Sequence, residues 1–331
     1  MKIAFYDTKP YDHIWFEPMA KEHDITIKFL ETKLNKITVK LAKDCDAVCV
    51  FVNDDVNEAV IKALKDYGIS LILLRCAGFN NVDIQAAKGN IHVLRVPSYS
   101  PEAVAEYTIG LLLTINRKIH RAYNRTREFN FSIHGLMGTD LKGKTAGVIG
   151  TGKIGQMTID ILKGIGMKIL AYDLYPNPDL DVEYVDKNEI FQRANVITLH
   201  CPLTKETEHM INKDAIDQMQ KGVILLNTSR GGLIDTKDLI EGLEHGIFGG
   251  VGLDVFEEEE EFFFEDRSDE IITKDTIIKL ISYPNVILTS HQGFFTKEAM
   301  EQIAKITLEN AEDFRKNRKM EDGYFKNEVH M

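Results

Sequence analysis

The sequence predicts an α/β protein made of two doubly wound units with parallel sheets. Short runs rich in Val, Ile and Leu alternate with amphipathic stretches along nearly the whole chain. Continuous apolar runs are typical of parallel strands that are buried on both faces. The repeated strand-helix-strand rhythm indicates doubly wound sheets, and a length of 331 residues is enough for two domains.

The expected strands follow from these apolar runs. In the first unit they are residues 3–6, 47–52, 71–75 and 93–96. In the second unit they are residues 145–149, 168–172, 196–200, 223–227, 251–254 and 286–289.

Two further helices are expected, one between the two units and one at the end of the chain. Ser100 is a suitable N-cap and Pro101 a suitable first residue for one long helix, which is expected from about Glu102 to about Glu128. Thr296 is expected to cap the last helix. Its apolar residues recur at i, i+3 and i+4 and predict one buried stripe, made of Met300, Ile303, Ala304, Thr307, Leu308 and Ala311.

Composition excludes several classes of protein. With 40 basic and 51 acidic side chains the net charge is −11, and an acidic chain is unsuited to binding nucleic acid. No apolar run approaches the length of a membrane span, and the N-terminus lacks the apolar region of a signal peptide. The cysteines form no C-x-x-C pair, so we expect no metal, and free thiols favour the cytoplasm; they are Cys45, Cys49, Cys76 and Cys201.

The strongest local motif is the glycine pattern G-x-G-x-x-G at residues 150–155. It follows an expected strand and opens an amphipathic stretch, and the next strand ends on Asp173. This arrangement is the dinucleotide fingerprint of Rossmann-like domains. Because a carboxylate at Asp173 accepts ribose hydroxyls and repels a 2′-phosphate, and because no Arg follows it, the motif favours NAD over NADP. The alternative is that the glycines serve only a tight turn.

Other polar residues lie at the expected carboxyl ends of strands in the same unit, where open α/β sheets bind ligands. Arg230 has a guanidinium suited to gripping a carboxylate, and a surface arginine in a turn is the alternative. His291 is a candidate acid or base, although a lone histidine is often structural. A carboxylate partner is expected in the run 257–261, where spacing does not distinguish five glutamates, and such a run is usually a solvated acidic face.

The whole chain resembles the D-isomer-specific 2-hydroxyacid dehydrogenases, and among them the fermentative enzymes that act on D-lactate. The matching segments are residues 75–83 (RCAGFNNVD), 97–106 (PSYSPEAVAE), 150–155 (GTGKIG), 200–204 (HCPLT), 227–231 (NTSRG), 252–255 (GLDV) and 290–292 (SHQ).

The resemblance implies roles for particular residues. The catalytic set becomes Arg230, His291 and Glu259, since the family's glutamate lies five residues after the aspartate of the segment at 252–255. NAD binding is implied for Gly150, Gly152, Lys153, Ile154, Gly155, Asp173, Cys201, Pro202, Thr207, Thr228, Ser229, Arg230 and Asp254. Substrate binding is implied for Ala77, Gly78, Tyr99, Arg230, Phe294 and Phe295.

The family pattern also implies domain organisation and partners. Residues 1–99 and 297–331 are expected to form a discontinuous substrate domain, with the NAD-binding domain, residues 100–296, inserted between them. A homodimer through the NAD-binding domain, or a tetramer, is expected. The implied reaction is reduction of pyruvate to D-lactate with NADH. Two other functions are alternatives. One is a dehydrogenase that acts on another small 2-oxo acid, such as glyoxylate, hydroxypyruvate or a branched 2-oxo acid, and the other is an NAD-sensing binding protein. A phosphoglycerate dehydrogenase is less expected, because no appended regulatory domain is evident in the sequence.

Overall fold

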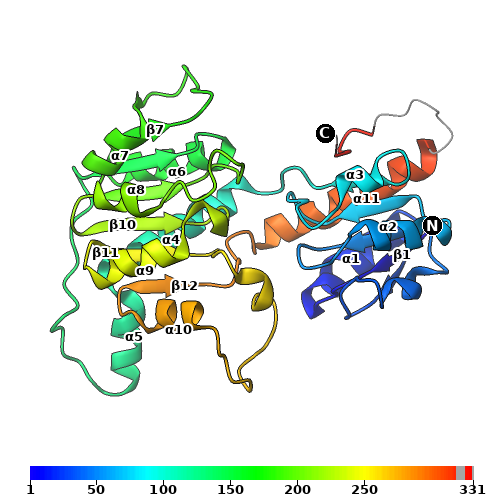
Figure 1. Ribbon diagram of the computed structural model, residues 1–331, viewed down its shortest axis with the longest axis horizontal. Coiled ribbons are helices and arrows are strands. Elements are labelled where there is room, and N and C mark those ends of the chain that lie inside the picture. The colour runs from blue at the N-terminus through cyan, green and yellow to red at the C-terminus, as the bar shows by residue number, and fades with distance from the viewer. Residues whose placement is uncertain (318–324, 330–331) are drawn as a thin grey trace. The chain divides into compact units, whose positions relative to one another are not determined.

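The computed structural model describes residues 1–317 and 325–329, and the chain divides into two compact units (Figure 1). Unit 1 comprises Met1–Ser100 and Thr296–Met331, and unit 2 comprises Pro101–Phe295. Residues 318–324 and 330–331 of the predicted substrate domain lie outside the described residues.

Unit 1 is built on a five-stranded parallel sheet with the strand order β2-β1-β3-β4-β5. Its strands are β1 (Lys2–Phe5), β2 (Thr26–Phe29), β3 (Ala47–Val50), β4 (Leu71–Leu74) and β5 (His92–Arg95). Its helices are α1 (Pro10–Glu22), the short 3-10 helix η1 (Val39–Ala42), α2 (Glu58–Asp66), α3 (Ile84–Ala87) and α11 (Lys297–Asn317). Every residue of β3 and β4 is buried, which explains their uninterrupted apolar sequences.

The helix α11 belongs to unit 1 although it follows all the strands of unit 2 in the sequence. Its N-terminus is capped as predicted, because the Thr296 Oγ1 accepts the Ala299 N–H at 3.2 Å. The predicted apolar stripe is buried throughout, and the helix packs against α1, β4 and β5. The last helix of the chain therefore completes the core of the first unit.

Unit 2 is built on a seven-stranded parallel sheet with the order β12-β11-β10-β9-β6-β7-β8. Its strands are β6 (Thr145–Ile149), β7 (Lys168–Tyr172), β8 (Glu183–Tyr184), β9 (Val196–Leu199), β10 (Val223–Asn227), β11 (Phe248–Leu253) and β12 (Val286–Leu288). The chain runs outward from β6 in one direction and from β9 in the other. Ligands of open α/β sheets bind at such a reversal, beyond the carboxyl ends of the strands.

Separate apolar clusters lie on the two faces of this sheet. One is formed with α4 (Pro101–Arg117) and α6 (Lys153–Gly164), and the other with α7 (Lys187–Arg193), α8 (Lys213–Asp217), α9 (Thr236–Glu244) and α10 (Asp275–Ser282). The remaining pieces are α5 (Ile119–Arg127) and the 3-10 helices η2 (Gly231–Leu233) and η3 (Glu259–Glu261). No helix in the described part of the chain is long and apolar enough to cross a membrane.

The helix α4 lies close to β11 because that strand has glycines at the crossing. A Cβ on Gly250 would overlap the Ile115 side chain, and a Cβ on Gly252 would lie 2.8 Å from Ile115 Cδ1. Gly250 and Gly252 are therefore packing positions, at which any side chain would push the helix off the sheet.

The prediction of one helix from residue 102 to residue 128 is wrong. The helix α4 ends at Arg117, and Lys118 has φ +52°, a left-handed conformation that interrupts a right-handed helix. The helix α5 then begins at Ile119 and buries none of its side chains. Without burial, no packing holds α5 in line with α4.

Candidate active site

The turn between β6 and α6 carries the predicted glycine motif, and two of its glycines occupy positions that exclude a side chain. Gly150 has φ +97°, and a Cβ there would lie 2.5 Å from the carbonyl carbon of His200. A Cβ on Gly155 would overlap the Gly150 carbonyl oxygen. At Gly152, in contrast, nothing lies within 4 Å of a Cβ position, so the chain is open to a ligand there.

The N-terminus of α6 fits a dinucleotide pyrophosphate. Gly152 is its N-cap and provides no side-chain capping bond, and both Gly152 and Lys153 are exposed. Ile154, the next residue of the first turn, is half-buried. The first N–H groups of a helix lack partners within the helix and attract anions. The backbone at the start of α6 is thus accessible, and its N–H groups can donate hydrogen bonds to phosphate oxygens.

Asp173 is held rigidly at the end of β7. Its Oδ2 accepts the Thr151 N–H at 2.6 Å and the Thr151 hydroxyl at 3.1 Å, and its Oδ1 accepts the Tyr175 N–H at 2.8 Å. Each carboxylate oxygen has two acceptor sites, so capacity remains for a ribose hydroxyl. Leu174 and Tyr175 are 72% and 83% exposed and offer no cation for a 2′-phosphate.

The loops after β9 and β10 are tied to one another. The Ser229 hydroxyl, after β10, donates to the Cys201 carbonyl, after β9, at 2.7 Å. Within the loop after β9, the Thr207 hydroxyl donates to the Pro202 carbonyl at 2.7 Å. Burial raises the pKa of the Cys201 thiol to about 11, so this thiol is neutral near pH 7 and is a poor nucleophile.

Thr228, another predicted cofactor residue, is buried and faces α4. Its hydroxyl lies 2.7 Å from the Thr108 hydroxyl. The side chain therefore links the end of β10 to the helix that covers this face of the sheet.

Arg230 lies in a turn, residues 227–231, that we call the Arg230 turn. Asn227, which is fully buried, braces it: its Nδ2 donates to the Arg230 carbonyl at 2.8 Å and its Oδ1 accepts the Ser229 N–H at 3.0 Å. The guanidinium donates to the Ser229 carbonyl through Nη1 at 2.7 Å. Asn227 was not predicted as a site residue. The feature of the sequence that could have indicated it is a polar amide at the end of an otherwise apolar strand.

His291 lies in a left-handed conformation, with φ +52°, after β12. Asp254, which is 1% exposed at the end of β11, holds its loop. The Asp254 carboxylate accepts the Gln292 N–H at 2.9 Å, the Gly293 N–H at 2.7 Å and the Thr289 hydroxyl at 2.6 Å. The Asp254 carbonyl also accepts the His291 N–H at 2.7 Å. A buried carboxylate thus holds the loop on both sides of the imidazole, through the Thr289 side chain before it and two backbone N–H groups after it.

Glu259 contacts His291 directly. Its Oε1 lies 2.9 Å from the His291 Nδ1, and its Oε2 accepts the Phe256 N–H at 3.0 Å. Both side chains retain solvent access, with 25% of His291 and 20% of Glu259 exposed. A carboxylate on Nδ1 fixes the tautomer and leaves Nε2 as the ring atom available to a ligand.

Other glutamates of the acidic run have different partners. Glu257 pairs with His209, Glu258 accepts the Thr276 hydroxyl, and Glu261 pairs with Lys274. The Glu260 side chain lies outside the described residues. Residues 255–261, the Glu259 loop, approach the Arg230 turn so closely that a Cβ on Gly231 would overlap the Phe256 carbonyl group.

The remaining predicted substrate residues belong to two regions. Ala77 and Gly78 follow β4, and Tyr99 follows β5; all three are half-buried residues of unit 1. Phe294 and Phe295 end unit 2, with Phe294 buried, Phe295 48% exposed, and their ring centroids 6.0 Å apart.

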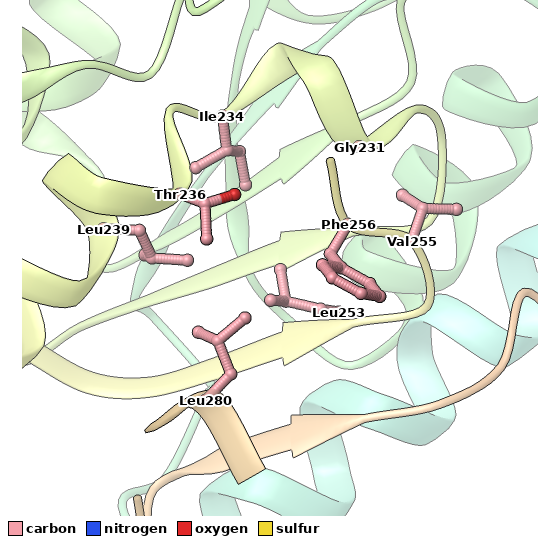
Figure 2. Close-up of a pocket in the computed structure, with 8 residues that line it drawn as sticks. All are labelled: Gly231, Ile234, Thr236, Leu239, Leu253, Val255, Phe256 and Leu280. Atoms are coloured by element: carbon pink, nitrogen blue, oxygen red, sulfur yellow. The ribbon is translucent and has the colours of Figure 1, made fainter. Parts of the chain in front are cut away.

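A small cavity lies behind the two loops of unit 2 (Figure 2). Its volume is about 10 Å³, roughly one water molecule. Thr236 is the one polar side chain among its lining residues, which are Gly231, Ile234, Thr236, Leu239, Leu253, Val255, Phe256 and Leu280. This cavity is too small for a substrate and is part of the apolar core.

A family comparison defines the class of the second unit. Residues 109–293 match the model described as D-isomer specific 2-hydroxyacid dehydrogenase, NAD binding domain. That stretch contains the glycine turn, the Arg230 turn and the His291 loop. Unit 2 thus contains an NAD-binding domain, the protein is an NAD-dependent oxidoreductase, and NAD is its cofactor.

Whole-chain comparisons extend the relationship over both units. The chain is 49% identical to the D-lactate dehydrogenase of Escherichia coli over 320 residues, which cover 96% of this chain and 97% of that one. The solved apo-structure of the Escherichia coli enzyme matches with a TM-score of 0.89, 46% identity and full coverage of both chains. A structure titled as the pyruvate reductase of Chlamydomonas reinhardtii matches with a TM-score of 0.91 and 41% identity, over 97% of this chain and 98% of that one. The chain belongs to the D-isomer-specific 2-hydroxyacid dehydrogenase family.

Proposed function

We propose that this protein is an NAD-dependent D-lactate dehydrogenase, which reduces pyruvate reversibly. The observation that carries the proposal is the contact between the Glu259 carboxylate and the His291 Nδ1, 2.9 Å apart, in a unit with an NAD-binding domain. Support also comes from the relatives, one a D-lactate dehydrogenase and one titled a pyruvate reductase. The reaction balances as pyruvate plus NADH plus a proton giving D-lactate plus NAD.

In the proposed complex, Arg230 holds the substrate carboxylate. A guanidinium can form two parallel hydrogen bonds to a carboxylate, which fixes the orientation of the substrate as well as its position. The Asn227 brace limits movement of the Arg230 backbone. The N–H groups of the Ala77–Gly78 segment are proposed as further donors to a substrate carboxylate. Tyr99 is proposed as a substrate-binding residue, and Phe294 or Phe295 as the residue that contacts the substrate side chain.

His291 is the proposed acid. Since its Nδ1 faces Glu259, the protonated ring presents its Nε2 proton to the carbonyl oxygen and delivers it as the alcohol forms. The Glu259 carboxylate orients the ring and offsets the charge of the imidazolium. NADH, when bound, supplies the hydride that adds to the carbonyl carbon. Hydrogen bonds from Arg230 and His291 to the substrate favour the developing negative charge on oxygen.

The cofactor contacts are proposed along the glycine turn and the neighbouring strand ends. The turn from Gly150 to Gly155 holds the pyrophosphate, and Asp173 accepts an adenosine ribose hydroxyl. The residues proposed to complete the site are Gly152, Lys153, Ile154, Cys201, Pro202, Thr207, Thr228, Ser229, Arg230 and Asp254. In this scheme unit 2 binds the cofactor and unit 1 is the substrate domain.

The first test is the initial rate of NADH oxidation by the purified protein with pyruvate, followed by chiral analysis of the lactate. Fast oxidation with D-lactate as product is expected. Oxidation with glyoxylate, hydroxypyruvate or a branched 2-oxo acid, and none with pyruvate, would assign another substrate. NADH binding without turnover on any of them would instead identify a binding protein.

Two substitutions test the proposed roles. Arg230→Lys keeps the charge and loses the two-pronged contact, so kcat/KM for pyruvate is expected to fall about 100-fold or more. His291→Ala removes the acid, and kcat is expected to fall by about 10²–10⁴ while NADH still binds. Wild-type kinetics in either variant would remove that residue from the mechanism.

We also propose a homodimer formed through unit 2, with a tetramer as a further assembly. Six large apolar side chains, each more than half exposed, lie between residues 119 and 137: Ile119, Tyr123, Phe129, Phe131, Ile133 and Met137. Such a cluster is typical of an interaction surface. A cytoplasmic location is proposed as well, supported by cysteines that are all free thiols.

Light scattering after size-exclusion chromatography tests the dimer. The double substitution Phe131→Ser with Ile133→Ser is expected to give monomers. Ile271→Ser is the matched control, since Ile271 is 90% exposed but outside the cluster. A monomeric wild-type protein would refute the dimer.

A further inference from the structure

Arg95 contacts the predicted carboxylate-binding loop of unit 1 at two points. It ends β5, and its Nη1 donates to the Ala77 carbonyl at 2.8 Å. Its guanidinium carbon also lies 5.3 Å from the centroid of the Phe79 ring, within the range of a cation–π contact. One cation therefore holds the loop on both sides of Gly78.

The contact with Ala77 determines where the Gly78 N–H points. The peptide between Ala77 and Gly78 is trans, so its C=O and N–H point in opposite directions. With the C=O directed at Arg95, the N–H is directed away from it. Within residues 1–317 and 325–329, no acceptor takes this N–H.

The charge of Arg95 also strengthens that donor. A hydrogen bond from a charged group polarises the peptide that accepts it, and polarised donors bind more strongly in partly buried sites. In the part of the chain that the structure describes, no carboxylate forms an ion pair with Arg95, so no such pair offsets its charge. The Cys76 thiol lies 3.3 Å from the Gly78 carbonyl and holds the next peptide.

Arg95 is itself fixed at its backbone. Its carbonyl accepts the Asn310 Nδ2 at 3.0 Å, and its N–H donates to the Asn327 carbonyl at 3.0 Å. The Asn327 Nδ2 in turn donates to the Asn310 Oδ1 at 2.8 Å. Because α11 and the C-terminal segment hold this backbone, the side chain extends from a rigid base.

We propose that Arg95 is a positioning residue for the substrate carboxylate: it aims and polarises the Gly78 N–H, and so adds attraction for an anionic 2-oxo acid. This inference rests on the proposed function, in which that N–H binds the carboxylate. It predicts weaker binding of carboxylate ligands when the charge is removed. It predicts little change in NADH affinity or in kcat, since Arg95 has no role in proton or hydride transfer.

The test is calorimetric binding of oxamate, which resembles pyruvate but is not reduced, to the NADH-loaded full chain. The variants are Arg95→Met, Arg95→Gln, which keeps a neutral donor, and Arg95→Lys, which keeps the charge. The matched control is Arg315→Met, because Arg315 also donates to backbone carbonyls of unit 1, those of His23 and Asp24. Thermal unfolding and NADH binding are measured for each variant.

The expected result is a Kd for oxamate, and a KM for pyruvate, raised about 10-fold in Arg95→Met and Arg95→Gln and partly restored in Arg95→Lys. The kcat of these variants is expected to stay within about 3-fold of wild type, and Arg315→Met should match wild type in oxamate affinity, KM and kcat. Folded Arg95→Met and Arg95→Gln proteins with wild-type oxamate affinity would overturn the inference, as would an equal loss in Arg315→Met. Should Arg95→Met fail to fold, Arg95→Gln decides.

The same measurement separates this inference from the proposed function. A wild-type protein that binds oxamate but reduces no 2-oxo acid would overturn the proposed function, and the oxamate affinities would still decide the role of Arg95. A wild-type protein that does not bind oxamate would overturn both.

Discussion

Gly231 is the point at which the Arg230 turn meets the Glu259 loop, and adding one methyl group there tests whether their spacing matters. In Gly231→Ala, the Cβ would lie 2.6 Å from the Glu257 backbone nitrogen and closer still to the Phe256 carbonyl group. Comfortable contact needs about 3.5 Å, so the loops must separate by roughly 1 Å. The obstacle is backbone, which cannot move aside as a flexible side chain can.

The expected result is a fall of about 100-fold in kcat/KM for pyruvate, because misplacement of catalytic groups by about 1 Å costs that much. A loss of about 1–3 kcal/mol in stability should accompany it. Gly232→Ala is the matched control: its Cβ would meet only the Leu203 side chain, at 3.1 Å, so it should stay within about 3-fold of wild type. Steady-state kinetics and thermal unfolding of both variants make the comparison. Activity within 3-fold of wild type in Gly231→Ala would refute the reasoning.

Three further predictions concern other parts of unit 2. Glu259→Gln removes the charge beside His291, so kcat should fall at least about 10-fold while the NADH affinity is unchanged. Stopped-flow kinetics measures kcat and fluorescence titration measures NADH affinity. A kcat equal to that of wild type would exclude a role of the Glu259 charge in catalysis. Burial lowers the pKa of His200 from its ordinary 6.5 to about 4, so between those values the unfolded chain binds more protons than the folded one. Stability should therefore rise with pH across that window and lose about 3 kcal/mol as pH falls from 6.5 to 4, a loss absent from His200→Gln in urea unfolding at each pH. Gly250→Ala would force Ile115 off β11 and should cost about 1–3 kcal/mol in the same assay, whereas an unchanged midpoint would contradict that packing.

The sequence predicted the buried strands well because burial on both faces leaves a plain record of Val, Ile and Leu. It missed β2 and β8, which are the edge strands of their sheets and are only partly buried. It also extended one helix through Lys118, since the apolar spacing continues across that residue and nothing local marks a left-handed conformation. Edges and breaks of this kind depend on what packs nearby, which a single sequence does not report.

The site was predictable to a different degree at each level. The glycine motif and Asp173 could be recognised because strand, turn and helix follow in order. The choice among five glutamates could not be made from spacing, because their partners come from distant segments: His209, Thr276, Lys274 and, for Glu259, His291. The sequence-based selection of Glu259 came from resemblance alone.

The residues that position the proposed catalytic groups share one physical pattern. Arg230, Glu259 and His291 follow three adjacent strands, β10, β11 and β12, and each is fixed by a hydrogen bond or bonds within unit 2: to Asn227, to the Phe256 N–H and through Asp254. Side chains held in this way lose little freedom when a ligand binds, so less of the binding energy is spent on ordering them. The proposed catalytic groups of unit 2 are thus positioned by hydrogen bonds within that unit. Substitution of Asn227, a brace outside the proposed cofactor site, should reduce kcat more than it weakens NADH binding.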